Sequence, residues 1–240
     1  MARRLATLIA LVGCLGSLIG CSTPNSAAPT LYSAAPITAT VVDKQTRAPL
    51  AGVHVAAIWL AQGGWEGGTP LGTVMVMETE TDESGRFHFP AWGPKEYHVP
   101  SGVNSNARVR NFAPELLLFK SGYDFGRSMN YYSDITDPKN MHSDWDGKIM
   151  PLERFSGTAR QYVQALGSLS IHLEVAIGDC QWENLQKMIR AIGMQSEVLK
   201  AEGGLWAIDN IYTHLIDNDN VFGTSRGCAS PRAVLGGKAK

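Results

Sequence analysis

Residues 41–57 read VVDKQTRAPLAGVHVAA, and residues 78–90 read ETETDESGRFHFP. Apolar side chains recur at every second position here, which is typical of short strands with one buried face. The alternating apolar positions are Ile37, Ala39 and Val41, then Val53, Val55 and Ala57, then Phe87 and Phe89. Runs of turn-forming residues separate these stretches, and we expect a further strand at residues 115–120.

Two motifs within these strands follow a known pattern. Residues 49–55 read P-L-x-G-V-x-V, and residues 81–89 read T-D-x-x-G-x-F-x-F. With Phe119, Gly122 and Tyr123 they make residues 37–125 resemble the carboxypeptidase regulatory-like domain, a small transthyretin-like β-sandwich. The resemblance implies a domain that accompanies an enzyme and is not itself catalytic. Long insertions at residues 60–72 and 97–110 depart from the simplest family members and leave the strand count open.

The N-terminus has the features of an export signal. Arg3 and Arg4 precede an apolar run at residues 5–19, and Leu-Ile-Gly-Cys ends at Cys21. This resembles a bacterial lipoprotein signal, which implies cleavage after residues 1–20 and acylation of Cys21. A rival motif ends at Cys14 but leaves an apolar run of only about nine residues. An ordinary secretory signal and an uncleaved anchor are further alternatives.

The residues that follow the predicted cleavage point indicate where in the cell the mature protein is expected to lie. Ser22, and not an aspartate, follows Cys21. By resemblance to lipoproteins of Gram-negative bacteria, this favours sorting to the outer membrane, with the protein facing the periplasm. Residues 22–36 are rich in Ser, Ala and Pro and carry no charge, so we expect a flexible tether. The 240-residue chain has formal net charge −1. A nucleic-acid partner is therefore not expected.

The last third of the chain changes to a helical period. Three apolar stripes predict about three helices: Phe155, Ala159, Tyr162, Val163, Leu166 and Leu169; Trp182, Leu185, Met188, Ile189 and Ile192; Leu205, Ile208, Ile211, Tyr212 and Leu215. We expect a polar connecting loop at residues 126–150, a helical region at 151–230 and a loose tail at 231–240. The fold class is thus predicted to be α+β, an Ig/transthyretin-like sandwich followed by helices that pack on it or on each other.

Catalytic motifs are absent from the sequence. No histidine has the glutamate three residues later that a zinc carboxypeptidase needs, and no nucleophile elbow, phosphate loop or dinucleotide motif occurs. Residues 144–147 and 217–220 resemble fragments of calcium loops but do not continue as one. We therefore predict no catalytic residue, metal or cofactor. An enzyme would be favoured if Asp134, His142 and Asp144 converged in a closed pocket.

Two cysteines remain once Cys21 is acylated and Cys14 is removed with the leader. Cys180 and Cys228 lie on the exported side, where an oxidising compartment preserves disulfides, so we predict that they are bonded. Closing a loop of this length stabilises the fold by roughly 4 kcal/mol on the chain-entropy argument. The alternative is a pair of buried thiols.

Several aromatic residues fall in turn-like contexts. Trp65, Trp92 and Tyr97 are the predicted binding-loop residues, since aromatics on loops of a rigid sandwich stack on sugars or anchor a partner. The alternative is that they cover the core beneath the loops. We expect a non-enzymatic, lipid-anchored envelope protein that binds or supports a protein or glycan. Alternatives are an envelope hydrolase with unrecognised catalytic groups and a component of a surface or secretion assembly.

Overall fold

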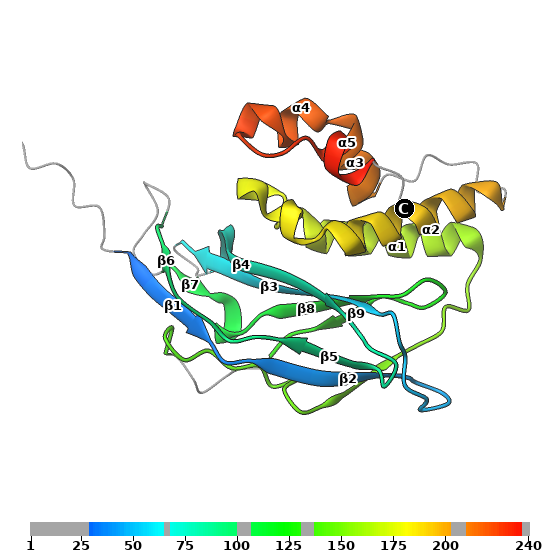
Figure 1. Cartoon of the computed structure of the whole chain (residues 1–240), viewed down its shortest axis with the longest axis horizontal. Coiled ribbons are helices and arrows are strands. Elements are labelled where there is room, and N and C mark those ends of the chain that lie inside the picture. Colours follow the sequence, from blue (N-terminus) through cyan, green and yellow to red (C-terminus); the bar gives the residue numbers. More distant parts are fainter. Residues whose placement is uncertain (1–28, 65–67, 100–106, 131–136, 203–209, 237–240) are drawn as a thin grey trace, which may run out of the picture.

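The computed structural model describes residues 29–64, 68–99, 107–130, 137–202 and 210–236. They form three layers: a smaller group of strands, a larger sheet, and helices that cover the outer face of the larger sheet (Figure 1). The predicted α+β character is confirmed. The leader and Cys21 lie outside the described residues. None of the helices in the described ranges combines the length and apolar character needed to cross a bilayer.

The smaller layer contains a three-stranded sheet and a two-stranded ribbon. In the sheet, β2 (Ile37–Asp43) pairs antiparallel with β5 (Arg86–Phe89) and parallel with β10 (Ile149–Leu152). In the ribbon, β1 (Thr30–Ala34) pairs antiparallel with β6 (Trp92–Tyr97). The alternating apolar residues of β2 and β5 point into the core, as the period of two predicts.

Strand β1 corrects the expectation that residues 22–36 are a tether throughout. Tyr32 is buried and packs edge-on against Tyr97 of β6. The main chain of Ser33 also exchanges hydrogen bonds with Pro138 and Met141. The strand escaped sequence analysis because its partners are distant in the chain, while its local composition is that of a linker.

The larger sheet has the order β4-β3-β8-β9, and β7 pairs with the end of β3. Its strands are β3 (His54–Gly63), β4 (Thr69–Glu80), β7 (Arg108–Val109), β8 (Glu115–Phe119) and β9 (Gly126–Ser128). A short 3-10 turn, η1 (Arg110–Phe112), joins β7 to the approach to β8. All pairs in this sheet are antiparallel.

Strand β3 lies at the centre of the molecule because both of its faces are buried. Val55, Ala57 and Trp59 face the smaller layer and form the sandwich core. Ala56 and Ile58 face the helices and form a second, helix–sheet core. The expectation of a single buried face is therefore wrong for β3, since helices far along the chain cover its other face.

The helical layer contains more elements than the three expected. In chain order these are α1 (Ala159–Glu174), η2 (Gly178–Asn184), α2 (Gln186–Ala201), α3 (Ile211–Asp217), α4 (Asp219–Phe222), η3 (Thr224–Arg226) and α5 (Pro231–Leu235). The hydroxyl of Thr158 caps α1, and the side chain of Asn210 caps α3. The apolar stripes of the sequence lie mainly in α1, in η2 with α2, and in α3, while residues 203–209 lie outside the described part.

Two predicted loops are also corrected. Residues 126–150 contribute β9 and the start of β10, so this segment is part of the sheets and not only a connection. Residues 231–235 form α5, whose Leu235 is buried against the other helices. Ser230 caps α5, and Asp219 accepts a hydrogen bond from the Arg232 main chain at 2.6 Å. These polar contacts hold a segment whose composition alone suggests a loose tail.

Candidate functional site

Two adjoining hollows lie where α2 passes the end of the larger sheet, and we call them together the α2 groove. The first lies between His54, Phe119 and Lys120 of the sheet and Met194 and Val198 of α2. The second continues past Ser121 to Phe155, Tyr162 and Glu202. Ser121, Gln195 and Val198 line both hollows, so the groove is continuous.

The wall formed by α2 is a helical stripe at the edge of the helix–sheet core, and Ala191 belongs to both. Ala191, Met194, Gln195 and Val198 recur at helical spacing and line the first hollow. The side chains of Met194 and Val198 are 59% and 50% exposed. Two apolar side chains one turn apart thus border an open groove, an arrangement typical of a contact surface.

Polar contacts shape the groove between its two parts. The Ser121 hydroxyl donates a hydrogen bond to Oε1 of Gln195, which joins the β8–β9 turn to α2. The phenol oxygen of Tyr162 accepts a hydrogen bond from the Gly122 main chain at 2.8 Å, and burial raises the Tyr162 pKa. The Tyr162 ring also stacks on Phe155, with ring centroids 4.4 Å apart. These interactions join the groove wall to the start of α1.

His54, which lines the groove, is uncharged at neutral pH. His54 stacks on Phe119, and its Nδ1 is buried without a hydrogen-bond partner among the described residues. Burial lowers the His54 pKa below its ordinary value of 6.5, although the nearby Glu80 carboxylate opposes this. The Lys120 ammonium donates to the carbonyl of Ala51 at 2.7 Å. The groove thus combines an apolar wall on α2 with the charged groups of Lys120 and Glu202 at its sides.

The described groove residues provide a contact surface, and they contain no evident pair of nucleophile and general base. The one aliphatic hydroxyl described above, on Ser121, is hydrogen-bonded to an amide and not to a general base. Sequence reasoning missed the groove because it treated only the main stripe of α2. The signal was present: Met194 and Val198 are apolar residues outside the stripe that contains Met188 and Ile192.

The predicted aromatic loop residues occupy other positions. Trp92 is buried and contacts Trp59 edge-on, with centroids 5.2 Å apart, because β6 turns it into the sandwich core. Tyr97 is half-buried, and its hydroxyl donates to the Leu71 carbonyl at 2.8 Å. Trp92 is therefore not a loop residue free to bind, and Tyr97 ends a strand. Trp65 lies outside the described residues.

In the described part of the polar stretch, residues 137–146, the side chain of Asn130 holds the main chain at residues 142 and 144. Buried Asn130 donates to the His142 carbonyl at 2.9 Å and accepts from the Asp144 amide at 2.8 Å. The residues His142 and Asp144 are themselves exposed. The structure thus does not place these two in a closed pocket, and Asp134 lies outside the described residues.

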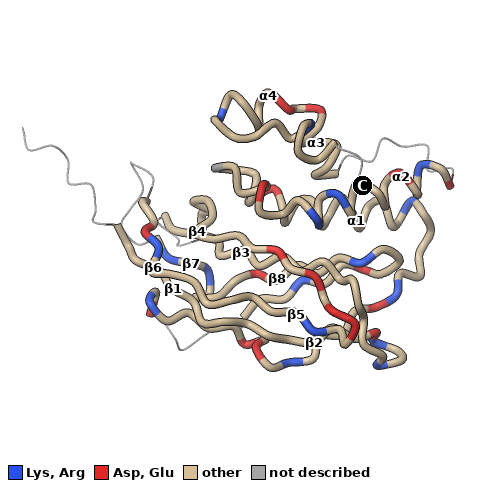
Figure 2. Tube along the Cα trace, in the orientation of Figure 1, with Lys and Arg blue, Asp and Glu red and all other residues tan. Residues whose placement is uncertain are grey.

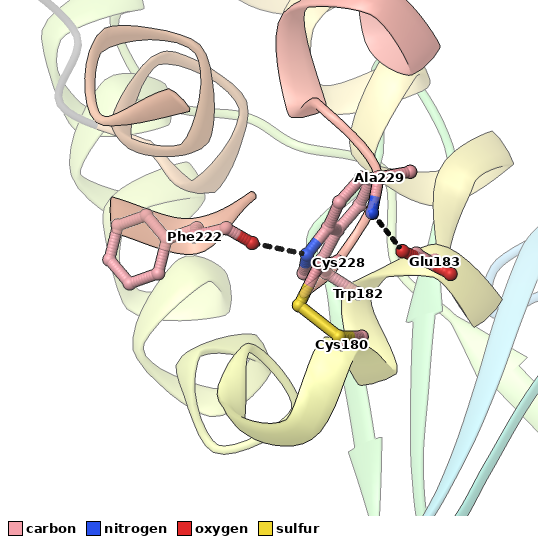
Figure 3. Close-up of a disulfide and its surroundings, with 6 residues drawn as sticks. All are labelled: Cys180, Trp182, Glu183, Phe222, Cys228 and Ala229. Atoms are coloured by element: carbon pink, nitrogen blue, oxygen red, sulfur yellow. Dashed lines mark hydrogen bonds between the residues drawn. A yellow bond between two sulfur atoms is a disulfide. The ribbon is translucent and has the colours of Figure 1, made fainter. Parts of the chain in front are cut away.

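The disulfide between Cys180 and Cys228, which the sequence predicts, joins η2 to the segment before α5 (Figure 3). Two further contacts accompany it: Glu183 accepts from the Ala229 amide at 2.8 Å, and the Trp182 indole donates to the Phe222 carbonyl at 3.2 Å. Glu183 is also near enough to both sulfurs to complete a set of metal ligands. Because the sulfurs are bonded to each other, neither is a thiolate, and the set serves as a structural clasp.

Comparisons with known proteins add little to this description. No protein-family model matches the chain, and no curated protein matches it. Among solved structures, 3-chlorocatechol 1,2-dioxygenase from Rhodococcus opacus 1CP is similar with a TM-score of 0.31 and 16% identity. The match covers 53% of this chain and 62% of that enzyme, which is less than two thirds of its length. A likeness at this level supports no argument about fold or activity.

Proposed function

We propose that this protein is a non-enzymatic, lipid-anchored protein of the bacterial cell envelope that docks a partner protein in the α2 groove. The observation that carries the proposal is the pair of exposed apolar side chains, Met194 and Val198, along a continuous groove. Because each residue is already about half buried, covering the rest would contribute about 1 kcal/mol for each.

The position of the groove suits an anchored protein. Strand β1 begins at one end of the long axis, while the β8–β9 turn and the end of α2 lie at the other (Figure 1). If Cys21 carries the lipid, residues 22–29 reach at most about 28 Å from it. The start of β1 and the groove lie at opposite ends of the described fold, which leaves the groove accessible when the chain is anchored through Cys21.

The sandwich serves as a rigid frame in this proposal. The regulatory-like motifs predict a transthyretin-like domain, and the packing of β2 and β5 against β3 and β8 in one core supports that assignment. Basic and acidic residues are both distributed over the sheets and helices (Figure 2). This distribution favours local contacts over long-range steering and supports the expectation of no nucleic-acid partner.

A protein partner is favoured over a glycan. Sugar binding by this sandwich was expected to use aromatic side chains on open loops. Trp92 is in the core and the Tyr97 hydroxyl is bonded to the main chain, so the described members of that set support it poorly. The two large apolar residues that the groove exposes, Met194 and Val198, are not aromatic, and such residues are common at protein–protein contacts.

Site-specific photo-crosslinking of the full chain in its native envelope tests the function. A photoreactive residue at Met194 should yield a defined crosslinked species, which Val198→Glu should abolish. Ile171 on α1 is the matched control, since it is 64% exposed and apolar but lies outside the groove. The same species from positions 194 and 171, or its persistence in Val198→Glu, contradicts docking in the groove.

Three further measurements separate the alternatives. Cys21→Ser should remove lipid from the chain and release it from the membrane fraction, as mass spectrometry and fractionation would show. A crosslinked species with the mass of two copies would identify self-association instead of a distinct partner. Hydrolysis of envelope material that His142→Ala abolishes would replace this proposal with an enzyme.

A further inference from the structure

A compact charge cluster surrounds Glu115 on the helix-facing side of the larger sheet. The Glu115 side chain is only 10% exposed, and its Oε1 lies 2.5 Å from Nε of Arg127. Its Oε2 lies 3.5 Å from Nη1 of Arg110, and its Oε1 lies 3.4 Å from Nδ1 of His172. Four elements, η1, β8, β9 and α1, therefore bring their charged or polar side chains to one point.

The cluster carries more positive than negative charge. One carboxylate faces two guanidinium groups, which leaves one positive charge when the imidazole is neutral. Burial together with the charges of Arg127 and Arg110 lowers the His172 pKa, against the opposing effect of Glu115, so the imidazole is neutral at neutral pH. The Nε of Arg110 donates to the neutral amide of Gln62 at 3.2 Å. The second guanidinium thus has no carboxylate of its own within the described contacts.

A small hollow adjoins the surplus charge. Its apolar lining comes from Ile58, Leu60, Ala113 and Pro114, and its polar lining includes Arg110 and Glu115. The side chains of Arg110 and Arg127 are 29% and 35% exposed, so solvent reaches both guanidinium groups. A cation therefore stands beside an apolar recess that accepts a group of about methyl size.

The local backbone holds Arg110 in this place. Asn111 and Phe112 have φ values of 52° and 48°, in the left-handed region that residues other than glycine rarely adopt. The Asn111 amide donates to the Asn130 carbonyl at 2.8 Å, which holds this turn against the loop after β9. Residues kept in such a conformation cluster at binding sites, where the surrounding structure compensates the cost.

We propose that the Glu115 cluster binds a carboxylate attached to a small apolar group, as in a peptide ending in alanine or a short carboxylic acid. The planar guanidinium fork matches the two oxygens of a carboxylate, and one negative charge neutralises the surplus. The apolar recess receives the attached methyl group. A phosphate dianion fits less well, because Glu115 repels its second charge. The cluster shares no residue with the α2 groove, so this site stands or falls independently of the docking function.

The test is a nuclear magnetic resonance titration of the full chain, labelled with 15N and purified from the envelope in detergent. The probe is N-acetyl-L-alanine, with its uncharged amide as the matched ligand. Saturable shifts of the arginine Nε–H signals with the acid alone are expected. Propionate distinguishes the two possible ligands, a short carboxylic acid and a peptide terminus. If propionate binds as tightly as N-acetyl-L-alanine, the ligand is a free carboxylic acid. If propionate binds more weakly, the ligand is a peptide terminus.

Substitutions at the cluster should change the affinity for the carboxylate in opposite directions. A cluster with only a structural role would not produce this pattern. Arg110→Gln should weaken binding about tenfold, because the guanidinium beside the recess supplies the charge-assisted hydrogen bonds. Glu115→Gln should tighten binding, because the competing carboxylate is removed. Arg86→Gln, an exposed arginine on β5, should change nothing.

Spectra of each variant without ligand show whether it is folded, and Arg110→Lys serves as a second, milder variant with intermediate affinity. The proposal is overturned if the amide binds as well as the acid, or if inorganic phosphate binds more tightly than either carboxylate. Weaker binding by a folded Glu115→Gln variant overturns it as well.

Discussion

The sandwich core and the helix–sheet core use opposite faces of the same strands but are joined differently. In the sandwich core, buried residues come from strands whose main chains are hydrogen-bonded to one another. In the helix–sheet core, the sheet contributes few residues, such as Ile58 and Phe119, and the helices contribute most of the rest. No main-chain ladder links helices to sheet, so side-chain contacts must hold this layer in place.

Most of these contacts are apolar, and the polar and covalent ones are few and join distant parts of the chain. Glu78 of β4 accepts hydrogen bonds from the main-chain amides of Lys187 and Met188 at the start of α2. The disulfide and the Arg190 bond to the Val234 carbonyl join the C-terminal segment to η2 and α2. The comparison teaches that main-chain pairing holds the strands of the sandwich, while apolar packing and a few cross-links hold the helical layer.

The largest effects should come from removing a buried tryptophan from either core. Trp59→Ala and Trp182→Ala should each lower the free energy of unfolding by about 3–5 kcal/mol. Both side chains are fully buried, in the sandwich and helix–sheet core respectively. Hydrogen exchange by mass spectrometry should show Trp182→Ala opening the helices while β2 and β5 stay protected. Equal loss of protection in both layers would contradict the independence of the two cores.

Loss of the disulfide should act on the helical layer alone. Cys180→Ser with Cys228→Ser should lower stability by up to roughly 4 kcal/mol, because the denatured chain regains loop freedom. Thermal denaturation of the variant, compared with the oxidised wild-type chain, measures the effect, and the reduced wild-type chain should match the variant. Two equivalents of free thiol in the denatured, unreduced mature protein would show that the bond does not form.

The cap supplied by Glu78 should have a smaller effect. Leu185, at the N-cap of α2, makes no side-chain capping bond, so the Glu78 carboxylate accepts from amides that α2 leaves unpaired. Glu78→Ala should cost about 1–2 kcal/mol in chemical denaturation. The matched control is Glu80→Ala on the same strand, where the residue is exposed. Equal losses in the two variants would refute the capping role.

The smallest effect is confined to acid and belongs to the sandwich. The Thr46 amide, the Tyr123 hydroxyl and the Gln45 amide lower the Asp43 pKa to about 2 from 3.8, despite the opposing effect of burial. The unfolded chain therefore binds this proton first, and the stabilisation is present above the unfolded pKa and lost as pH falls through the folded one. Unfolding free energies measured across this range should fall less steeply with decreasing pH in Asp43→Asn. An unchanged slope would assign the acid sensitivity to other groups.

Local patterns were sufficient to predict much of the sandwich. The period of two at residues 37–41 and 86–89 predicts which side chains of β2 and β5 are buried, because strand geometry places alternate residues on opposite faces. The helical period similarly predicts the buried stripe of α1. Cys180 and Cys228 could be paired because the expected leader and lipid anchor account for the other two cysteines, and the structure contains the bond.

Only the tertiary structure decides which elements cover the apolar faces of these strands and helices. Ala56 and Ile58 are buried by helices beyond residue 158, and Trp92 enters the core because β6 pairs with β1. The α2 groove and the Glu115 cluster likewise depend on elements that are distant in sequence, as when His172 of α1 reaches Glu115 of β8. Periodicity shows which side of an element is apolar. Which distant element covers that side, and which polar groups then meet, depends on packing that no local window of the sequence contains.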